Sequence, residues 1–323
     1  MQFESTHAPL VSVVIPNYNH APYLQERIES VFGQEMDDME VILLDDCSTD
    51  SSREIIERYR GHDKVSHIVC NDSNSGSTFA QWKRGIGLAR GKYVWIAESD
   101  DSADAGFLSV LVPLLEAHQK AVVAYCGSHI IDASGSVIQG ADWDRMGKKA
   151  PRVELLDPHT MIRRNLLMNN GIYNASMAVF RRETAPAIDS RLTSMRFCGD
   201  WWFWAELAMR GDAIRLRERH NYFRQHSRKV SPSASKEGLT YREGFTVINA
   251  MADFLDLSQR QREVLAGRTL KRLKRFPALS PRCNVEIRSG FERLLRGDGW
   301  RSPVKLRLLY ELDKVMNFSH LHD

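Results

Sequence analysis

The first hundred residues alternate short apolar runs with helix-like segments, and this alternation constrains the fold more than any other feature. The apolar runs have the length and β-branched content of buried strands: 10–16, 39–44, 65–70 and 92–97. Segments with helical periodicity follow the first three runs: 23–33, 51–59 and 79–89. This order predicts an α/β protein with a Rossmann-like, mostly parallel sheet flanked by helices.

The rest of the chain is less regular. It predicts a helix at 104–119, strands at 121–125 and 175–180, and a helix from Asp200 to just before Gly211. From Arg242 onward the pattern is helical. We therefore predict an α/β domain over residues 1–240 and a basic helical C-terminal extension over residues 241–323.

Charge supports this division. Residues 245–323 carry 15 Lys and Arg against 9 Asp and Glu, whereas the first 244 residues carry 29 against 32. The overall charge of +3 is too small to indicate a nucleic-acid partner. The basic tail combines Lys and Arg with Leu at helical spacing, in 268–276 and 302–318. Such helices either make a peripheral contact with anionic lipid or pack on the core or on a second subunit as a homodimer.

Other classes of protein fit less well. The five scattered cysteines never form CxxC, which argues against a disulfide framework and a zinc cluster and favours a reducing, cytoplasmic setting. The N-terminus lacks the pattern of a signal peptide, and no run of 18 apolar residues occurs. The first predicted strand is not followed by GxGxxG, as in an NAD-linked oxidoreductase, or by the glycine-rich, basic phosphate loop of a nucleotidyltransferase.

Polar clusters follow three of the predicted strands, at the edge where sheets of this kind bind ligands. They are Pro16-Asn17-Tyr18-Asn19, Asp45-Asp46 and Glu98-Ser99-Asp100-Asp101. Neighbouring carboxylates repel one another, and a divalent cation relieves that repulsion while binding a diphosphate. The alternative for the last cluster is a solvated acidic turn. Three further residues are interpreted as helix caps: Ser48, Thr49 and Asp50.

A carboxylate among aromatic residues occurs in the segment 197–204. Burial beside aromatic rings would raise the pKa of Asp200 and suit it to general-base catalysis. The alternative is that Asp200 only caps a core helix, and most of the rings belong to the core in either case. The stretch 221–231 concentrates four basic residues and is either a lid over a diphosphate or a basic surface loop: Arg224, His226, Arg228 and Lys229.

Taken together, these segments resemble family 2 glycosyltransferases, which have the GT-A fold and invert the sugar's configuration. VSVVIPNYNHAPYLQERIESVFGQ is similar to their first strand–helix unit, and VILLDDCSTDSS to their second. The segment that ends in ESDD resembles their metal-binding motif, although many relatives have Asp in place of Glu98. Cys198-Gly199-Asp200 resembles the catalytic-base motif, and NYFRQHSRKVS the loop after it. The resemblance covers roughly residues 10–231.

The resemblance implies that six residues contact the nucleotide of a nucleoside-diphosphate sugar, with UDP the expected nucleoside diphosphate: Pro16, Tyr18, Asp45, Asp46, Lys83 and Arg84. Within this set Tyr18 stacks on the base and Asp46 hydrogen-bonds it.

The resemblance also implies roles for the acidic motif. Asp100 contacts ribose or sugar, with Glu98 beside it, and Asp101 is the direct ligand of Mg²⁺ or Mn²⁺. His226 touches the metal or the diphosphate, and Asp200 is the general base. The expected acceptor is a hydroxyl of a glycan or lipid-linked molecule, in surface polysaccharide synthesis. The alternatives are a non-catalytic nucleotide-sugar-binding module on a degenerate transferase fold and a nucleotidyltransferase.

Overall fold

The computed structural model describes residues 8–141, 143–144, 151–226, 238–273, 281–297, 302–317, 319 and 321. These residues form two compact units. The sheet unit comprises the described residues of Met1–Asp157, Ile172–Ser194 and Arg210–Ser227, and the helical unit those of Pro158–Gly171, Met195–Met209 and Arg228–Asp323. This division differs from the predicted boundary at residue 240, because the helix that carries Asp200 groups with the C-terminal helices.

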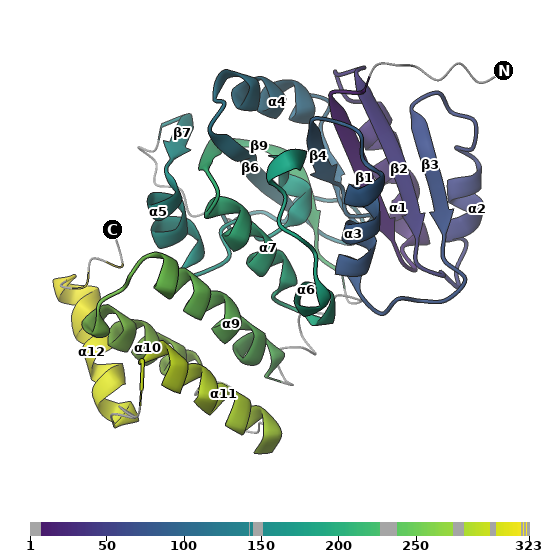
Figure 1. The fold of residues 1–323 in the computed structure, drawn as a ribbon. Helices are drawn as coiled ribbons and strands as arrows, with labels where there is room; N and C mark the ends of the chain where they lie inside the picture. Colours follow the sequence, from purple (N-terminus) through teal and green to yellow (C-terminus); the bar gives the residue numbers. More distant parts are fainter. Residues whose placement is uncertain are drawn as a thin grey trace. The chain divides into compact units, whose positions relative to one another are not determined.

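The described residues of the sheet unit form one nine-stranded sheet with the order β3-β2-β1-β4-β8-β6-β9-β5, and β7 pairs with β9 (Figure 1). The strands are β1 Val11–Asn17, β2 Met39–Asp45, β3 Val65–Cys70, β4 Tyr93–Ile96, β5 Ser102–Ala103, β6 Ala121–Ile131, β7 Val153–Leu156, β8 Ala178–Arg181 and β9 Asp212–Arg224.

The first four strands confirm the predicted parallel order. β1 pairs parallel with β2 and β4, and β2 pairs parallel with β3. The remainder of the sheet is more mixed than predicted, since β8 runs antiparallel to both β4 and β6. β9 was not predicted; it runs parallel to β6 and antiparallel to β5 and β7.

Helices cover both faces of the parallel strands. The sheet unit contains α1 Ala21–Phe32, α2 Ser52–Glu57, α3 Thr78–Leu88, α4 Phe107–Ala117, α6 Ser190–Ser194 and the short 3₁₀ turns η2 Ala175–Met177 and η3 Arg182–Thr184. Alternate residues of β1 face opposite sides, so Val13 lies in one core cluster with Ile28 of α1 and Leu111 of α4. On the other face α3 contacts β1 at Gly85, where an added Cβ would lie 2.2 Å from Cγ1 of Val14.

The helical unit contains α5 Pro158–Thr160, the π-helical η1 Met161–Leu166, α7 Gly199–Ala208, α9 Leu239–Phe254, α10 Gln259–Leu273, α11 Pro281–Leu294 and α12 Pro303–Met316 (Figure 1). Within it α9 packs on α7 and α11, and α10 packs on α12. The rings of Phe245 and Phe291 lie 4.5 Å apart, and Arg262 is fully buried. The C-terminal helices therefore share a core with α7. Among the described residues, no helix combines the length and apolar character needed to cross a bilayer.

Candidate active site

The three polar clusters follow strands that are neighbours in the sheet, because β1 lies between β2 and β4. Parallel strands end at the same edge, so the turns after β1, β2 and β4 gather there as predicted. Pro16 is buried within β1, whereas Tyr18, directly after the strand, is 46% exposed. Lys83, on α3, is also exposed. Tyr18 is thus an exposed aromatic residue at this edge of the sheet.

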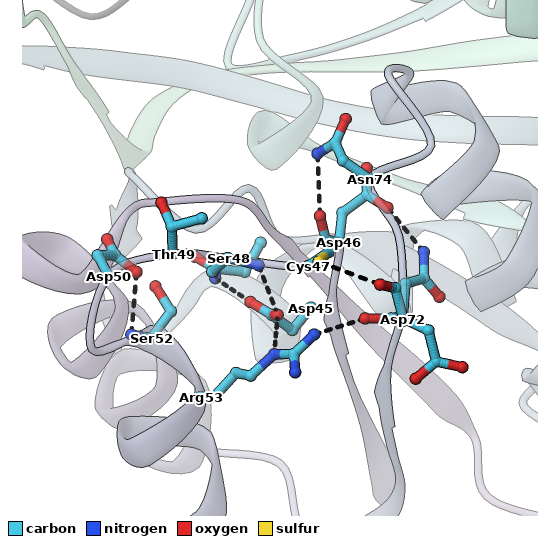
Figure 2. Close-up of polar contacts among 12 residues, drawn as sticks. Asp45, Asp46, Cys47, Ser48, Thr49, Asp50, Ser52, Arg53, Asp72 and Asn74 are labelled. Carbon is cyan, nitrogen blue, oxygen red and sulfur yellow. Dashed lines mark hydrogen bonds and ion pairs between the residues drawn. The ribbon is translucent and has the colours of Figure 1, made fainter.

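Asp45 stabilises the turn after β2. Its side chain is fully buried. One oxygen accepts a hydrogen bond from the amide of Asn17 at 3.0 Å, and the other accepts from the backbone N–H of Ser48 at 2.9 Å and from Arg53 at 3.0 Å (Figure 2). These bonds tie the ends of β1 and β2 to the start of α2. The carboxylate therefore holds the turn in place.

Asp46 is bound by the segment that connects β3 to α3 and by α3 itself. One of its oxygens accepts from the side chains of Asn71 and Gln81 and from the backbone N–H of Ser75, at 2.7, 2.8 and 2.9 Å. The Ser75 hydroxyl donates to the other oxygen at 2.7 Å. Arg84 donates to the side-chain oxygen of Asn71 at 2.6 Å, so it approaches Asp46 through that residue. The predicted base-binding carboxylate is thus fixed in one orientation.

The residues interpreted as helix caps divide into two groups. Asp50 accepts from the backbone N–H of Ala21, the first residue of α1, and from that of Ser52, the first residue of α2, both at 3.0 Å. This confirms the capping role of Asp50. Ser48 and Thr49 instead bind Asn19, which has a left-handed φ of 56°. They stabilise the turn between β1 and α1, so the capping interpretation is wrong for them.

Asp101 is fully buried and held by three donors. One oxygen accepts from Asn174 at 2.6 Å and from the Ser176 hydroxyl at 2.8 Å. The other accepts from the backbone N–H of Arg224 at 3.0 Å. These donors precede β8 or end β9, so Asp101 connects the acidic turn after β4 to the neighbouring parts of the sheet. The carboxylate therefore holds the acidic turn in place, and its role as the direct metal ligand stays a prediction.

Asp100 lies in different surroundings. Its Oδ2 is 2.9 Å from Nε2 of His226, the two side chains being 15% and 3% exposed. His20, after β1, brings a second imidazole: the ring centroids of His20 and His226 are 5.6 Å apart. Asp100, His20 and His226 each offer one ligand atom, and these atoms all lie within 4.8 Å of one another. Two imidazoles and one carboxylate form a donor set that suits Mn²⁺ and similar ions.

Glu98 turns toward α3. Its Oε1 accepts a hydrogen bond from the indole N–H of Trp82 at 2.8 Å, and its backbone oxygen accepts from Arg27 at 2.9 Å. Burial, with the charge of Asp100 next in importance, raises the pKa of Glu98 to about 8. Burial likewise lowers the pKa of Arg27 to about 10. Glu98 is thus held in place by Trp82 and Arg27.

Arg224 was placed in a stretch interpreted as either a lid over a diphosphate or a basic surface loop, and it belongs to neither. It ends β9, is 1% exposed, donates to the backbone oxygen of Asp100 at 2.8 Å and pairs with Glu26 at 2.6 Å. A buried side chain with these bonds anchors the acidic turn. His226 is also buried. The other two basic residues of the stretch, Arg228 and Lys229, lie outside the described residues.

Asp200 belongs to the helical unit and lies in the first turn of α7. Burial raises its pKa to about 7, although Asn170 donates to its Oδ2 at 2.9 Å. A carboxyl group with this pKa can both accept and release a proton near neutral pH. Of the rings that follow, Trp202 is buried in the core, whereas Trp201 donates to the backbone oxygen of Leu166 at 3.0 Å. The pKa of Asp200 is thus raised by burial, the effect that the sequence predicts.

Sequence reasoning missed several residues that hold or complete these sites. They are His20, Asn170, Asn174, Ser176 and Glu243. Only His20 had a local signal, since it follows the first polar cluster directly. The others come from distant parts of the chain.

The family is decided by the match of residues 12–188, more than half of the chain, to the model described as Glycosyl transferase family 2. The chain belongs to glycosyltransferase family 2. Among curated relatives, it is 33% identical over 114 residues to the glycosyltransferase GlyG of Streptococcus pneumoniae (35% of this chain, 38% of GlyG). It is 30% identical over 176 residues to the poly(ribitol-phosphate) beta-N-acetylglucosaminyltransferase TarS of Staphylococcus aureus (50% of this chain, 29% of TarS). The chain thus spans about a third of these relatives.

Solved structures support the GT-A fold. Residues 1–349 of S. aureus TarS, in complex with UDP-GlcNAc, superpose with a TM-score of 0.66 at 17% identity, covering 97% of this chain and 90% of that one. The mannosyltransferase PcManGT of Pyrobaculum calidifontis, in complex with GDP-Man and Mn²⁺, gives a TM-score of 0.52 at 15% identity, covering 97% and 89%. At these identities the likeness concerns the fold, and the predicted α/β class with flanking helices is confirmed.

Proposed function

We propose that this chain is an inverting glycosyltransferase that moves a sugar from a nucleoside diphosphate, with UDP the favoured one, to an acceptor hydroxyl. The observation that carries the proposal is the cluster of Asp100, His20 and His226 at the edge where the parallel strands end. In a family 2 chain, this edge takes the nucleotide sugar. The proposal of UDP draws support from the TarS structures in complex with UDP-GlcNAc and with UDP.

We assign the divalent metal to Asp100, His226 and His20, in place of Asp101. Asp101 has both oxygens bound by protein donors, whereas Asp100 faces the two imidazoles. When bound, the ion neutralises charge that develops on the leaving nucleoside diphosphate. Two nitrogen ligands favour Mn²⁺ over Mg²⁺, which prefers oxygen ligands.

The remaining groups act on the nucleotide and the acceptor. Tyr18 stacks on the base, and Asp46 accepts a hydrogen bond from it. Asp200 accepts the proton of the acceptor hydroxyl, whose oxygen forms a bond to the anomeric carbon while the bond from that carbon to the diphosphate oxygen breaks. This single displacement inverts the anomeric centre, and it requires no second nucleophilic carboxylate. The pKa of Asp200, raised by burial to about 7, suits this step.

The test measures UDP release from UDP-GlcNAc with Mn²⁺, with and without EDTA. We expect release that EDTA abolishes and that Asp200→Asn lowers by on the order of a thousandfold, while Mn²⁺-dependent UDP binding by calorimetry is kept. Binding without release in the unsubstituted protein would indicate the non-catalytic module instead. Retained turnover in Asp200→Asn would reject the base assignment, and a product with the donor's anomeric configuration would reject inversion.

The acceptor is proposed as a hydroxyl of a surface polysaccharide or of its lipid-linked precursor. Support comes from TarS, whose name specifies a poly(ribitol-phosphate) acceptor. A panel of polyol-phosphate and glycan acceptors, assayed by UDP release above the hydrolysis rate, tests this class. No acceleration by any member of the panel would count against it.

We also propose that the outer face of α12 contacts anionic lipid at the inner face of the plasma membrane. Apolar residues at helical spacing are exposed there, among them Val304 at 71% and Val315 at 85%, and Lys305 and Lys314 are exposed beside them. An amphipathic, basic helix of this kind binds anionic membrane surfaces. Flotation with phosphatidylglycerol vesicles should be lost in Val315→Ser.

The control for flotation is Val285→Ser, which removes an exposed apolar side chain from α11 and should leave vesicle binding unchanged. Light scattering tests the alternative, in which a second copy of this chain binds α12. A dimer that Val315→Ser dissociates, together with no flotation of the unsubstituted protein, would indicate a second copy of this chain on α12 and reject the lipid contact.

A further inference from the structure

Glu243 of α9 is a buried carboxylate that binds the segment leading into α7. It is 6% exposed. Its Oε1 accepts a hydrogen bond from the backbone N–H of Arg196 at 3.0 Å, and its Oε2 accepts from those of Phe197 and Cys198, both at 2.9 Å. Three consecutive backbone N–H groups thus point at one side chain that lies 45 to 47 positions away in sequence.

These three N–H groups have no partner within a helix, because they precede the first residue of α7, Gly199. Backbone N–H groups that are shielded from water need an acceptor, and a negative charge at the start of a helix also interacts favourably with the helix dipole. Hydrogen bonds from a charged acceptor are about twice as strong as those between neutral groups. The orientation of the first turn of α7 therefore depends on Glu243.

Asp200 is the second residue of α7, two positions after the last of the bonded N–H groups. On its other side it accepts a hydrogen bond from Asn170 at 2.9 Å. The side chain of Cys198 bonds to the backbone oxygen of Thr240 at 3.7 Å, so α9 holds this segment at a second point. The position of the Asp200 carboxyl is thereby fixed by contacts entirely within the helical unit.

We propose that Glu243 is a positioning residue for the general base: it fixes the first turn of α7 so that Asp200 is held ready for proton transfer. The proposal rests on the proposed role of Asp200. It gives the C-terminal helices a part in the reaction, because the group that orients the base is on α9. An error of about 1 Å in the position of a catalytic group can cost on the order of a hundredfold in rate.

The charge of Glu243 acts on Asp200 as well. Burial is the main cause of the raised pKa of Asp200, and the nearby negative charge of Glu243 raises it further. A neutral isostere at position 243 should therefore do two things. It should loosen the three backbone contacts, and it should move the ionisation of Asp200 to lower pH.

The experiment compares the unsubstituted chain with Glu243→Gln, which keeps the shape, and Glu243→Asp, which keeps the charge on a shorter side chain. Two readouts are used: hydrogen exchange of the amides of Arg196, Phe197 and Cys198, and the pH profile of UDP release from UDP-GlcNAc with Mn²⁺. Asp313→Asn is the control, because Asp313 is a buried carboxylate of the same unit that binds Ser319. Thermal melting identifies variants that fail to fold.

For Glu243→Gln we expect faster hydrogen exchange at the three amides. We also expect kcat lowered on the order of tenfold or more with an unchanged KM for the donor, and an acidic limb of the pH profile that is displaced to lower pH. For Glu243→Asp the exchange and kcat should change and the acidic limb should stay. Asp313→Asn should lower the melting temperature with no change in the limb.

Two failures are distinguishable. Retained turnover in Asp200→Asn would reject Asp200 as the base and with it the role of Glu243 toward that base. With Asp200→Asn inactive, an unchanged exchange rate and pH profile in Glu243→Gln would overturn the inference. The inference would also be overturned by a loss of activity that only parallels a lower melting temperature, as in Asp313→Asn.

Discussion

The neighbouring carboxylates Asp100 and Asp101 are expected to respond in opposite ways to the same substitution. Asp101→Asn replaces an oxygen with an NH₂ group in a fully buried position where Asn174, Ser176 and the backbone N–H of Arg224 all donate. The amide has one acceptor oxygen, so in either orientation it faces at least one donor with its NH₂ group. Asp100→Asn keeps a polar group 2.9 Å from Nε2 of His226, and an imidazole nitrogen can donate to the amide oxygen or accept from the amide NH₂.

The size of the difference follows from these contacts. A hydrogen bond to a charged group contributes about 1.5–3 kcal/mol, and a buried donor left without an acceptor adds its desolvation cost. Losing one or two such bonds should lower the free energy of unfolding of Asp101→Asn by about 2–4 kcal/mol. For a unit of this size that corresponds to a decrease in melting temperature on the order of 10 °C. Asp100→Asn should stay within about 1 kcal/mol of the unsubstituted protein.

The assay measures thermal melting without metal, and Mn²⁺ binding in the presence of UDP by electron paramagnetic resonance. Asp100→Asn should melt normally and bind Mn²⁺ at least tenfold more weakly, because one of three ligands is impaired. Asp101→Asn should melt early and, below its melting temperature, bind Mn²⁺ with little change. The reasoning is refuted by the reverse pattern, in which Asp101→Asn melts normally and loses Mn²⁺ while Asp100→Asn retains it.

Three further predictions concern single positions. Because the base must be ionised and burial raises the pKa of Asp200 to about 7, kcat/KM for UDP release should increase with pH through about 7; a limb near pH 4 would contradict this. Cys47 has a left-handed φ of 61°, so Cys47→Gly should be more stable than Cys47→Ala by about 1 kcal/mol in urea unfolding, and equal stabilities would count against strain there. Gly85→Ala should lower the free energy of unfolding by about 2 kcal/mol, because the added Cβ would lie 2.2 Å from Cγ1 of Val14. Gly87→Ala on the same helix meets nothing within 4 Å and should raise the free energy of unfolding by up to about 1 kcal/mol. Similar effects of the two substitutions would refute the packing argument.

The parallel half of the sheet could be predicted because its signal is local. Residues of β1, β2 and β4 are buried on both faces, so they appear in the sequence as continuous apolar runs. β9 could not be recognised in this way. It alternates buried residues such as Ile214 and Leu216 with Arg215 and Arg217, and its last four residues, 221–224, begin the stretch interpreted as a lid or a basic surface loop. Its strand conformation comes from pairing with β5, β6 and β7, which is a property of the tertiary structure.

The same distinction applies to the site. The acidic turn after β4 was found because clustered carboxylates directly follow a strand. The different surroundings of Asp100 and Asp101 depend on Asn174, Ser176 and Arg224, which lie 73 to 123 positions away from Asp101. No spacing along the chain indicates which of two adjacent carboxylates these donors will bind. The resemblance to a family motif located the turn and implied a metal on Asp101, whereas the donors around Asp101 are the reason for our proposal of Asp100.

The two units share one arrangement, in which a buried carboxylate bound by protein donors lies near a second carboxylate with a proposed role in the reaction. Asp101 fixes the turn that carries Asp100, and Glu243 fixes the turn that carries Asp200. Donors from distant segments hydrogen-bond the first carboxylate of each pair, so its charge can be buried without a metal or a proton. The second carboxylate lies close to this like charge, which favours binding a cation at Asp100 and adds to the effect of burial in favouring a proton on Asp200. Loss of activity alone therefore cannot distinguish the members of a pair. Thermal melting distinguishes Asp101 from Asp100, and hydrogen exchange of the amides of Arg196, Phe197 and Cys198 distinguishes Glu243 from Asp200.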